Sequence, residues 1–281
     1  MTERPPYLRV FLTFARNSLI RDMTFRSNFI IESITSLLWM GANLAFYILI
    51  FHYTPRIGLP APGDADPGWG KFQFLIFFGT AIMINSLVQA FFMLNAEEFS
   101  EKIRTGSLDF ALVKPIDTQF LISLHRIRWA ALANFGFGVV LMVYSLGQLD
   151  YHPTLAQIVL YPIFILCGVA IMYSLMIALA ATSVWLGRNQ SLYNFWFYIT
   201  NFSRYPMEIY DGPFGTPLQK VFTFAIPILI AINIPARLMA KPLEAQNWPL
   251  VAFALVATAG SLILSRWFFN RSLLSYRSAS S

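Results

Sequence analysis

The sequence has few charged residues and few residues of the kinds that hold metals or form disulfides. Of its 281 residues only 12% are charged, and it has 3 His and 1 Cys. Soluble domains carry about 25% charged residues, because their surface needs polar cover, and a single Cys cannot form a disulfide within the chain. These shortages exclude an ordinary soluble domain, a disordered chain and a disulfide-stabilised small domain.

The chain is instead rich in apolar residues, with 57% hydrophobic residues and 27 Phe. Because a transmembrane helix needs about 20 apolar residues, we expect an all-α polytopic membrane protein with six transmembrane helices, forming one domain over residues 1–281. Residues 1–26 have apolar residues at helical spacing, but five arginines interrupt them. This predicts an amphipathic interfacial helix, and the alternative is an unstructured basic tail. The expected spans are 28–51, 72–94, 129–148, 151–187, 189–203 and 249–269.

The longest polar stretch, residues 95–128, contains ten charged residues and therefore lies outside the membrane. The sequence has no P-loop, no metal-binding His pair, no nucleophile elbow and no paired acidic motif outside a Pro/Gly loop. We therefore predict no catalytic residue, no metal ligand, and an energy source outside the chain. Glu32 is the one carboxylate candidate for ion coupling in a span, and it is also explained as an interfacial group near Arg26 or Asn28.

Basic residues predict the orientation, since Lys and Arg collect in cytoplasmic loops. With the N-terminus, 95–128, 187–190 and the C-terminus inside, 14 of the 20 Lys and Arg lie on the inner side. Both termini are then cytoplasmic. If 221–236 crosses instead of 189–203, the inner side holds 16, so charge alone slightly favours that alternative.

Two segments carry a resemblance to a known family. Residues 97–117 combine an acidic helix, a basic residue, x-Gly-x-Leu-Asp, two apolar residues and a Pro. This pattern resembles the cytoplasmic loop of ABC-2 type transporter permeases, most closely a small, poorly characterised subfamily. Residues 204–236, with Ile-Pro-Ile and Ile-Pro-Ala, are similar to the family's segment before its last span. The matching residues of the first segment are Glu101, Arg104, Gly106, Leu108, Asp109, Leu112 and Pro115.

The resemblance implies the permease subunit of an ATP-driven ABC exporter in a bacterial-type cell membrane. It implies a dimer with a second copy or a related permease, two partner ATPase subunits that bind ATP and Mg²⁺, no cofactor on this chain, membrane lipid as surroundings and no nucleic acid. The cargo would be amphipathic: a lipid, glycolipid, glycan, peptide or hydrophobic drug. An ion-coupled secondary transporter, or less favourably an intramembrane lipid-modifying enzyme, is the alternative.

Segment 95–118 is then the cytoplasmic coupling loop, and 204–248 is an outer segment of re-entrant helices. We expect a short helix parallel to the membrane, with Phe99 and Ile103 as an apolar ridge for the ATPase and Gly106 ending the helix. The expected coupling residues are Glu97, Glu98, Phe99, Glu101, Lys102, Ile103, Arg104, Gly106, Leu108, Asp109 and Pro115.

Polar and aromatic residues at membrane depth are candidates for the translocation path, although such residues also join helices by hydrogen bonds. They are Asn43, Asn85, Gln89, Phe92, Asn134, Trp196 and Asn201. The short, Pro-interrupted region before the last span is typical of broken helices, and its candidates for an outer gate are Pro206, Glu208, Asp211, Pro227 and Pro235.

Overall fold

The computed structural model describes residues 6–58, 68–186, 190–210, 212–242 and 248–276. The described chain is helical apart from a two-stranded antiparallel ribbon, in which Arg56 pairs with Gly70. The elements are α1 (Tyr7–Thr24), α2 (Arg26–Tyr53), β1 (Arg56–Ile57), β2 (Trp69–Gly70), α3 (Lys71–Val88), η1 (Gln89–Met93), α4 (Leu94–Arg104), α5 (Asp109–Leu112), α6 (Thr118–Leu124), η2 (Trp129–Ala131), α7 (Leu132–Gly147), α8 (Leu155–Ala181), α9 (Ser183–Leu186), α10 (Gln190–Asn201), η3 (Phe202–Arg204), η4 (Met207–Tyr210), α11 (Gly215–Lys220), η5 (Val221–Ala225), α12 (Ile228–Ala240) and α13 (Trp248–Leu274).

Five of the described helices are long and apolar enough to cross a membrane, and they agree with five of the six expected spans. They confirm an all-α, multi-pass membrane protein. The sixth expected span, 189–203, is covered by α10, whose 12 residues reach only about 18 Å at 1.5 Å per residue. The long apolar run before Arg188 is one helix from Leu155 to Leu186, as its length and lack of a turn signal predicted.

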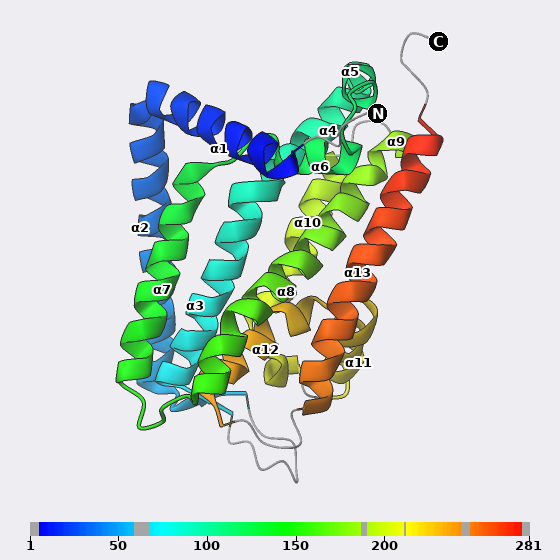
Figure 1. The fold of residues 1–281 in the computed structure, drawn as a ribbon. Helices are drawn as coiled ribbons and strands as arrows, with labels where there is room; N and C mark the ends of the chain where they lie inside the picture. The colour runs from blue at the N-terminus through cyan, green and yellow to red at the C-terminus, as the bar shows by residue number, and fades with distance from the viewer. Residues whose placement is uncertain (1–5, 59–67, 187–189, 211, 243–247, 277–281) are drawn as a thin grey trace.

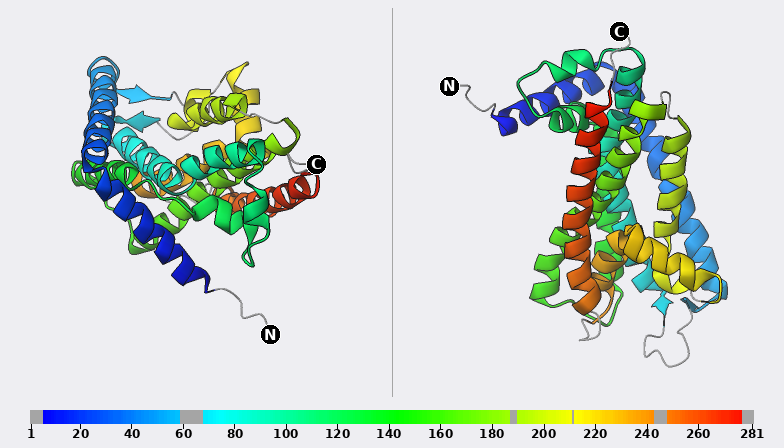
Figure 2. Two further views of the ribbon diagram at one scale, coloured as in Figure 1. Left: turned by 90° about the horizontal axis from the view of Figure 1, so that it is seen from above. Right: turned by 90° about the vertical axis from the view of Figure 1, so that its right-hand side faces the viewer.

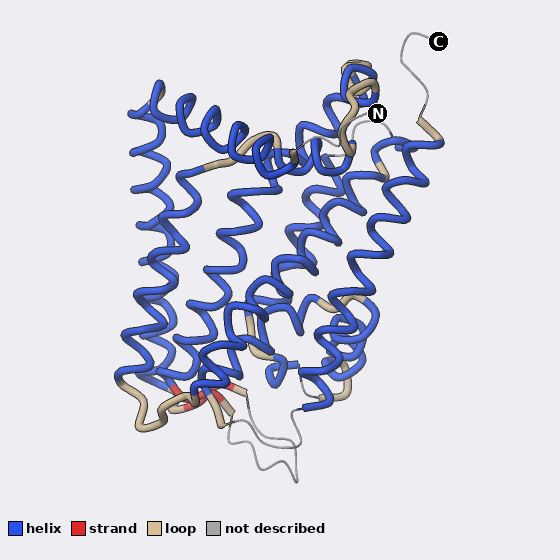
Figure 3. The backbone as a smooth tube through the Cα atoms, in the orientation of Figure 1, coloured by secondary structure: helices blue, strands red, loops and turns tan. Residues whose placement is uncertain are grey.

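The helices form a bundle with two distinct ends (Figure 1). At one end lie α1, the segments α4 to α6, α9 and the last turn of α13. We call this the α1 end. At the opposite end lie α11 and the β1–β2 ribbon, which Figure 3 marks in red. We call this the ribbon end. The N-terminal helix α1 and the segment 95–128, which the basic residues placed on one side of the membrane, thus lie together.

The α3 helix is the centre of the bundle. Its side chains Phe74, Ile76 and Phe77 are fully buried, and the helix packs against α7, α8 and α12. Gly79 and Gly138 allow α3 and α7 to approach closely, because a Cβ on Gly138 would lie 2.8 Å from the Gly79 carbonyl oxygen. Small residues at such contacts are typical of packed membrane helices.

The region between α10 and α13 is a hairpin of short helices. The helix Gly215–Ala225 meets α12 with a bend of 88° at Pro227. Gln157, near the start of α8, donates to the carbonyl oxygens of Leu238 and Lys241, so the last turn of α12 lies at the ribbon end. At the start of the region, Met207 N–H donates to Asn233 Oδ1 on α12. Figure 2 shows α10 running beside α2 and the hairpin filling the space below it. By length and composition the bent pair is either a broken span or a re-entrant hairpin. The re-entrant placement of 204–248 and the crossing by 189–203 therefore stay predictions.

Candidate functional site

The segment with the family pattern is the continuation of the central helix. Lys71–Arg104 is one helix of 34 residues, which contains a π-helical turn at Gln89–Met93. The short helix expected parallel to the membrane is instead the end of this long helix, since no proline interrupts residues 71–104. The helix ends as expected at Gly106, which has a φ of 71° and lets Leu108 N–H donate to Lys102 O at 3.1 Å.

One face of this segment is buried against the ends of two spans. Phe99 and Leu108 are fully buried, and their cluster includes Ile177 of α8 and Phe269 of α13. The Phe99 and Phe269 rings lie 5.5 Å apart. Phe99 is therefore not the exposed ridge that helical spacing suggested, and Ile103 packs partly buried against the same cluster. Both residues join the segment to the bundle.

Asn95 is the main polar link inside the segment. Its side chain is 1% exposed, and its Nδ2 donates to the carbonyl oxygens of Ser123 at 2.9 Å and Arg126 at 2.8 Å. Its Oδ1 accepts from the Arg126 N–H at 3.1 Å. Buried backbone groups need such partners, so Asn95 fixes the return of the chain from α6 toward α7.

A charged cluster surrounds Glu98, one turn further along. The Glu98 carboxylate pairs with Arg126, accepts from His125 Nε2 at 2.8 Å and lies 3.9 Å from Lys102. Burial, followed by the nearby Lys102, lowers the pKa of His125 to about 4, so the ring is neutral at pH 7. Glu98 and Lys102, both expected to face the ATPase, are thus partly buried within the segment.

The opposite face of the segment is open to solvent in this chain. Glu101 and Arg104 form an exposed ion pair, with Arg104 Nε 2.9 Å from Glu101 Oε2. The α5 tip exposes two apolar side chains, Phe110 at 74% and Val113 at 80%. The other expected coupling residues Glu97 and Pro115 are exposed, and Asp109 begins α5. Exposed apolar residues rimmed by charge are typical of a surface that binds a protein.

An ion pair ties the end of the segment to the last helix. Asp117 caps α6 by accepting from Phe120 N–H at 2.9 Å, and it pairs with Arg266 of α13. The hydrogen bond from Arg266 holds the pKa of Asp117 below its usual value. No local pattern predicts this pairing, because the two residues are 149 positions apart.

A cleft between α2, α3 and α10 brings together four of the seven residues expected on the translocation path. Asn43, Asn85, Gln89 and Trp196 all line it. The Trp196 indole N–H is buried and has no hydrogen-bond partner among the described residues. The cleft has a volume of about 100 Å³, which is below the roughly 300–1,000 Å³ of small-molecule pockets. Its further lining includes Thr200, Arg204, Trp39, Tyr47, Phe78 and Phe197.

The other three candidates for the path lie outside this cleft. The Phe92 ring packs against Tyr173, 4.5 Å away. Asn134 donates to Ser36 Oγ at 2.5 Å and so joins α7 to α2. Asn201 is half-buried near the end of α10 but does not line the cleft. Asn134 therefore joins two helices, which is the commoner role of such residues.

The expected gate residues lie in the hairpin. Glu208 pairs with Arg237 of α12, Pro206 is buried, and Pro227 stands at the bend. Pro235 is buried inside α12, and Asp211 lies outside the described residues. Glu32 pairs with Arg128, with Nε and Oε1 3.5 Å apart, rather than with Arg26. Among the described residues no group of three or more His, Cys, Asp or Glu could hold a metal ion.

One comparison with known proteins gives a match. A family model described as "ABC-2 family transporter protein" matches residues 37–280, which is most of the chain. No curated protein and no solved structure matches the chain. The matched region includes the cleft, the segment with the family pattern and the hairpin.

Proposed function

Because the chain belongs to the ABC-2 family of transporter proteins, we propose that it is the permease subunit of an ATP-driven exporter of amphipathic molecules. Permeases of this family work with ABC ATPases in general. The proposal includes an ATPase dimer at the α1 end, which would make that end and both termini cytoplasmic, and a second permease subunit beside this one.

The observation that carries the proposal is the continuity of one helix. Asn85 and Gln89 of α3 line the cleft, and Glu101 and Arg104 are exposed at the far end of the same 34-residue helix. A displacement at the exposed end is therefore transmitted along the helix to the cleft. The π-helical turn lies between the two parts, and such turns are frequent at functional sites.

The docking surface consists of the exposed residues of the segment rather than the buried ones. Phe110 and Val113 would enter an apolar groove of the ATPase, with Glu101 and Arg104 at its rim. The buried residues Phe99 and Leu108, together with the partly exposed Asp117, pass the movement to α8 and α13, because they contact those helices. ATP-driven closure of the ATPase dimer would then separate α2 from α10 and enlarge the cleft.

The cleft supports an amphipathic cargo. Amide and hydroxyl side chains lie beside aromatic rings along it, and its only charged lining residue among those described is Arg204. The unpaired indole N–H of Trp196 would donate to an acceptor on the cargo, since a buried donor without a partner costs free energy. Nothing in the cleft selects one cargo within this class.

The test is copurification of the chain with an ABC ATPase, together with ATP hydrolysis and efflux from inverted vesicles. We expect the double variant Phe110→Asp, Val113→Asp to weaken association about tenfold or more, the effect of losing a contact worth about 1.4 kcal/mol or more. The matched control is Phe214→Asp, because Phe214 is 92% exposed and lies beside α11 at the ribbon end. Association should be unchanged in that control.

A variant that carries the replacements at Phe110, Val113, Glu101 and Arg104 together should lose ATPase coupling. Normal coupling in that variant would contradict the proposed docking surface. Efflux that needs an ion gradient instead of ATP, and that is lost in Glu32→Gln, would support an ion-coupled transporter in its place. The pairing of Glu32 with Arg128 favours ATP-driven over ion-driven efflux, because it gives this carboxylate a structural role.

A further inference from the structure

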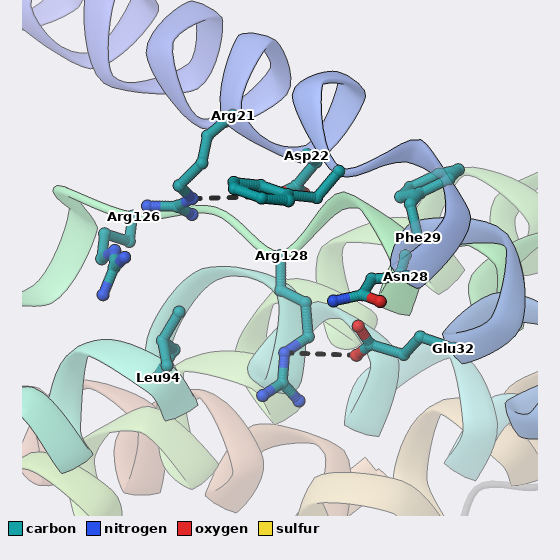
Figure 4. Close-up of a pocket in the computed structure, with 10 residues that line it drawn as sticks. Arg21, Asp22, Asn28, Phe29, Glu32, Leu94, Arg126 and Arg128 are labelled. Carbon is teal, nitrogen blue, oxygen red and sulfur yellow. Dashed lines mark ion pairs between the residues drawn. The ribbon is translucent and has the colours of Figure 1, made fainter.

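A basic cavity lies at the α1 end, apart from the cleft and from the exposed tip of α5. It has a volume of about 270 Å³ and is formed where α1, α2, Leu94 and the segment 126–130 meet. Figure 4 shows Arg21 and Asp22 on α1 on one side of it, and Arg128 and Glu32 on the other.

Three arginines and two carboxylates line the cavity, and their pairing is incomplete. Arg21 Nε lies 3.7 Å from Asp22 Oδ1, and Arg128 Nε lies 3.5 Å from Glu32 Oε1. Both distances exceed the roughly 2.7–2.9 Å of a strong charge-assisted hydrogen bond. A guanidinium has five N–H donors in a fixed fork, so Arg21 and Arg128 keep donors for a ligand.

The contacts of Asp22 and Arg126 outside the cavity do not remove its excess of one arginine over the carboxylates. Asp22 also accepts from the Trp129 N–H at 3.3 Å, which draws part of its charge away from Arg21. The third arginine, Arg126, pairs with Glu98, a carboxylate that also contacts His125 and Lys102. With three arginines against two carboxylates, the lining has a net charge of +1, which favours an anionic ligand.

Apolar surface adjoins the arginines. Phe25 and Phe29 line the cavity, and Phe25 is 64% exposed. The next turns of α2 expose Ile30, Ile31 and Ile34. An anion with an apolar tail fits this arrangement, whereas a free anion uses only the arginines. Trp129, a residue type enriched at membrane interfaces, adjoins the cavity and indicates that it lies at headgroup level.

We propose that this cavity binds the phosphate group of an anionic membrane lipid, with Arg21 and Arg128 as the principal donors. Guanidinium groups bind phosphate oxygens in pairs. The bound phosphate would bridge α1 to the start of α7 and so fix the position of α1 across the end of the bundle. The proposal does not depend on the transported cargo or on an ATPase.

The test measures the affinity of the purified full-length chain for phosphatidylglycerol in detergent, at a salt concentration that screens diffuse attraction. Phosphatidylcholine and inorganic phosphate are the comparison ligands. We expect phosphatidylglycerol to bind more tightly than either. The variant Arg21→Gln, Arg128→Gln should bind it about tenfold or more weakly, because it removes the charge-assisted hydrogen bonds of both guanidinium groups.

The matched control is Arg9→Gln, Arg16→Gln, which removes the same charge from exposed positions of α1 outside the cavity. An equal loss in this control would overturn the proposal, since it would show only general attraction. Displacement of the lipid by inorganic phosphate at equal concentration would also overturn it, in favour of a soluble anion. If the double glutamine variant does not fold, Arg128→Lys keeps the charge without the fork, and undiminished affinity there would contradict a role for that guanidinium.

Discussion

Helices α2 and α3 are equally apolar in sequence, but α2 lies at the periphery of the bundle and α3 at its centre. Their most apolar stretches have equal mean hydropathy, yet 78% of the α3 stretch is buried within the chain and only 6% of the α2 stretch is. Hydropathy therefore reports that a helix can enter a membrane and says nothing of where it stands in the bundle. In lipid the two positions are equally acceptable to an apolar side chain, because lipid tails are as apolar as Leu.

Position is decided instead by small residues and by a few specific contacts. The α3 helix reaches α7 through Gly79 and Gly138. The α2 helix touches α3 through the Tyr47 ring, which lies 4.8 Å from the Phe74 ring. Further links are the Phe51 ring, which lies 5.5 Å from the Phe74 ring, the hydrogen bond between Asn134 and Ser36, and the ion pair of Glu32 with Arg128. On the α2 side the cleft is lined by Trp39, Met40, Asn43 and Tyr47.

The sharpest way to test the comparison is one truncation made in both helices. Leu75 of α3 is 2% exposed and Leu38 of α2 is 69% exposed. We expect Leu75→Ala to lower the free energy of unfolding by about 3 kcal/mol, because it leaves a void in a packed core. Leu38→Ala should change it little, since lipid or detergent fills the space. Thermal or denaturant unfolding in detergent measures both, and equal losses would refute the assignment of α2 to the periphery.

The reverse change, adding a methyl group to a glycine, is expected to have the next largest effect. A Cβ on Gly138 would lie 2.8 Å from both the Gly79 carbonyl oxygen and Met83 Cγ, whereas a Cβ on Gly41 of α2 meets nothing within 4 Å. Overpacking a tight contact costs about 1–3 kcal/mol, so Gly138→Ala should be destabilising by that amount. Gly41→Ala should be neutral or slightly stabilising, because Ala favours helices. The same unfolding assay decides, and a stabilising Gly138→Ala would mean that α3 and α7 are not in close contact.

Much of the fold follows from the sequence because a membrane imposes a simple length rule. The five long helices begin close to the expected residues, and all but Lys71–Arg104 also end close to them. Pro227 stands at the bend of the hairpin. The sequence could not show that 97–104 continues α3, since polar residues end a span without ending a helix. The sequence also predicted an exposed Phe99, which is buried. Helical spacing shows which residues share a face, but it does not show what that face packs against.

The residues of the cleft were predicted from the sequence, whereas the polar contacts that hold the segment together were not. Asn43, Asn85 and Trp196 were chosen only as polar or aromatic residues at membrane depth, and they do meet in one cleft. The residues that join the polar segment together, such as Asn95 and Arg266, were missed as a set because their partners are distant in sequence. Pairings across 28 to 149 positions leave no local pattern.

The smallest expected effect concerns the one interhelical hydrogen bond by which α2 is held to α7 in the described residues. Asn134 Nδ2 donates to Ser36 Oγ, and such bonds between membrane helices average about 0.6 kcal/mol in double-mutant cycles. We expect a coupling of that size between Asn134→Ala and Ser36→Ala, measured from the unfolding of the two single variants and the double variant. The cycle is its own control, because each single change also removes contacts that are not shared. A coupling near zero would mean that packing, such as the contacts of the Tyr47 and Phe51 rings with Phe74, holds α2 in place rather than this hydrogen bond.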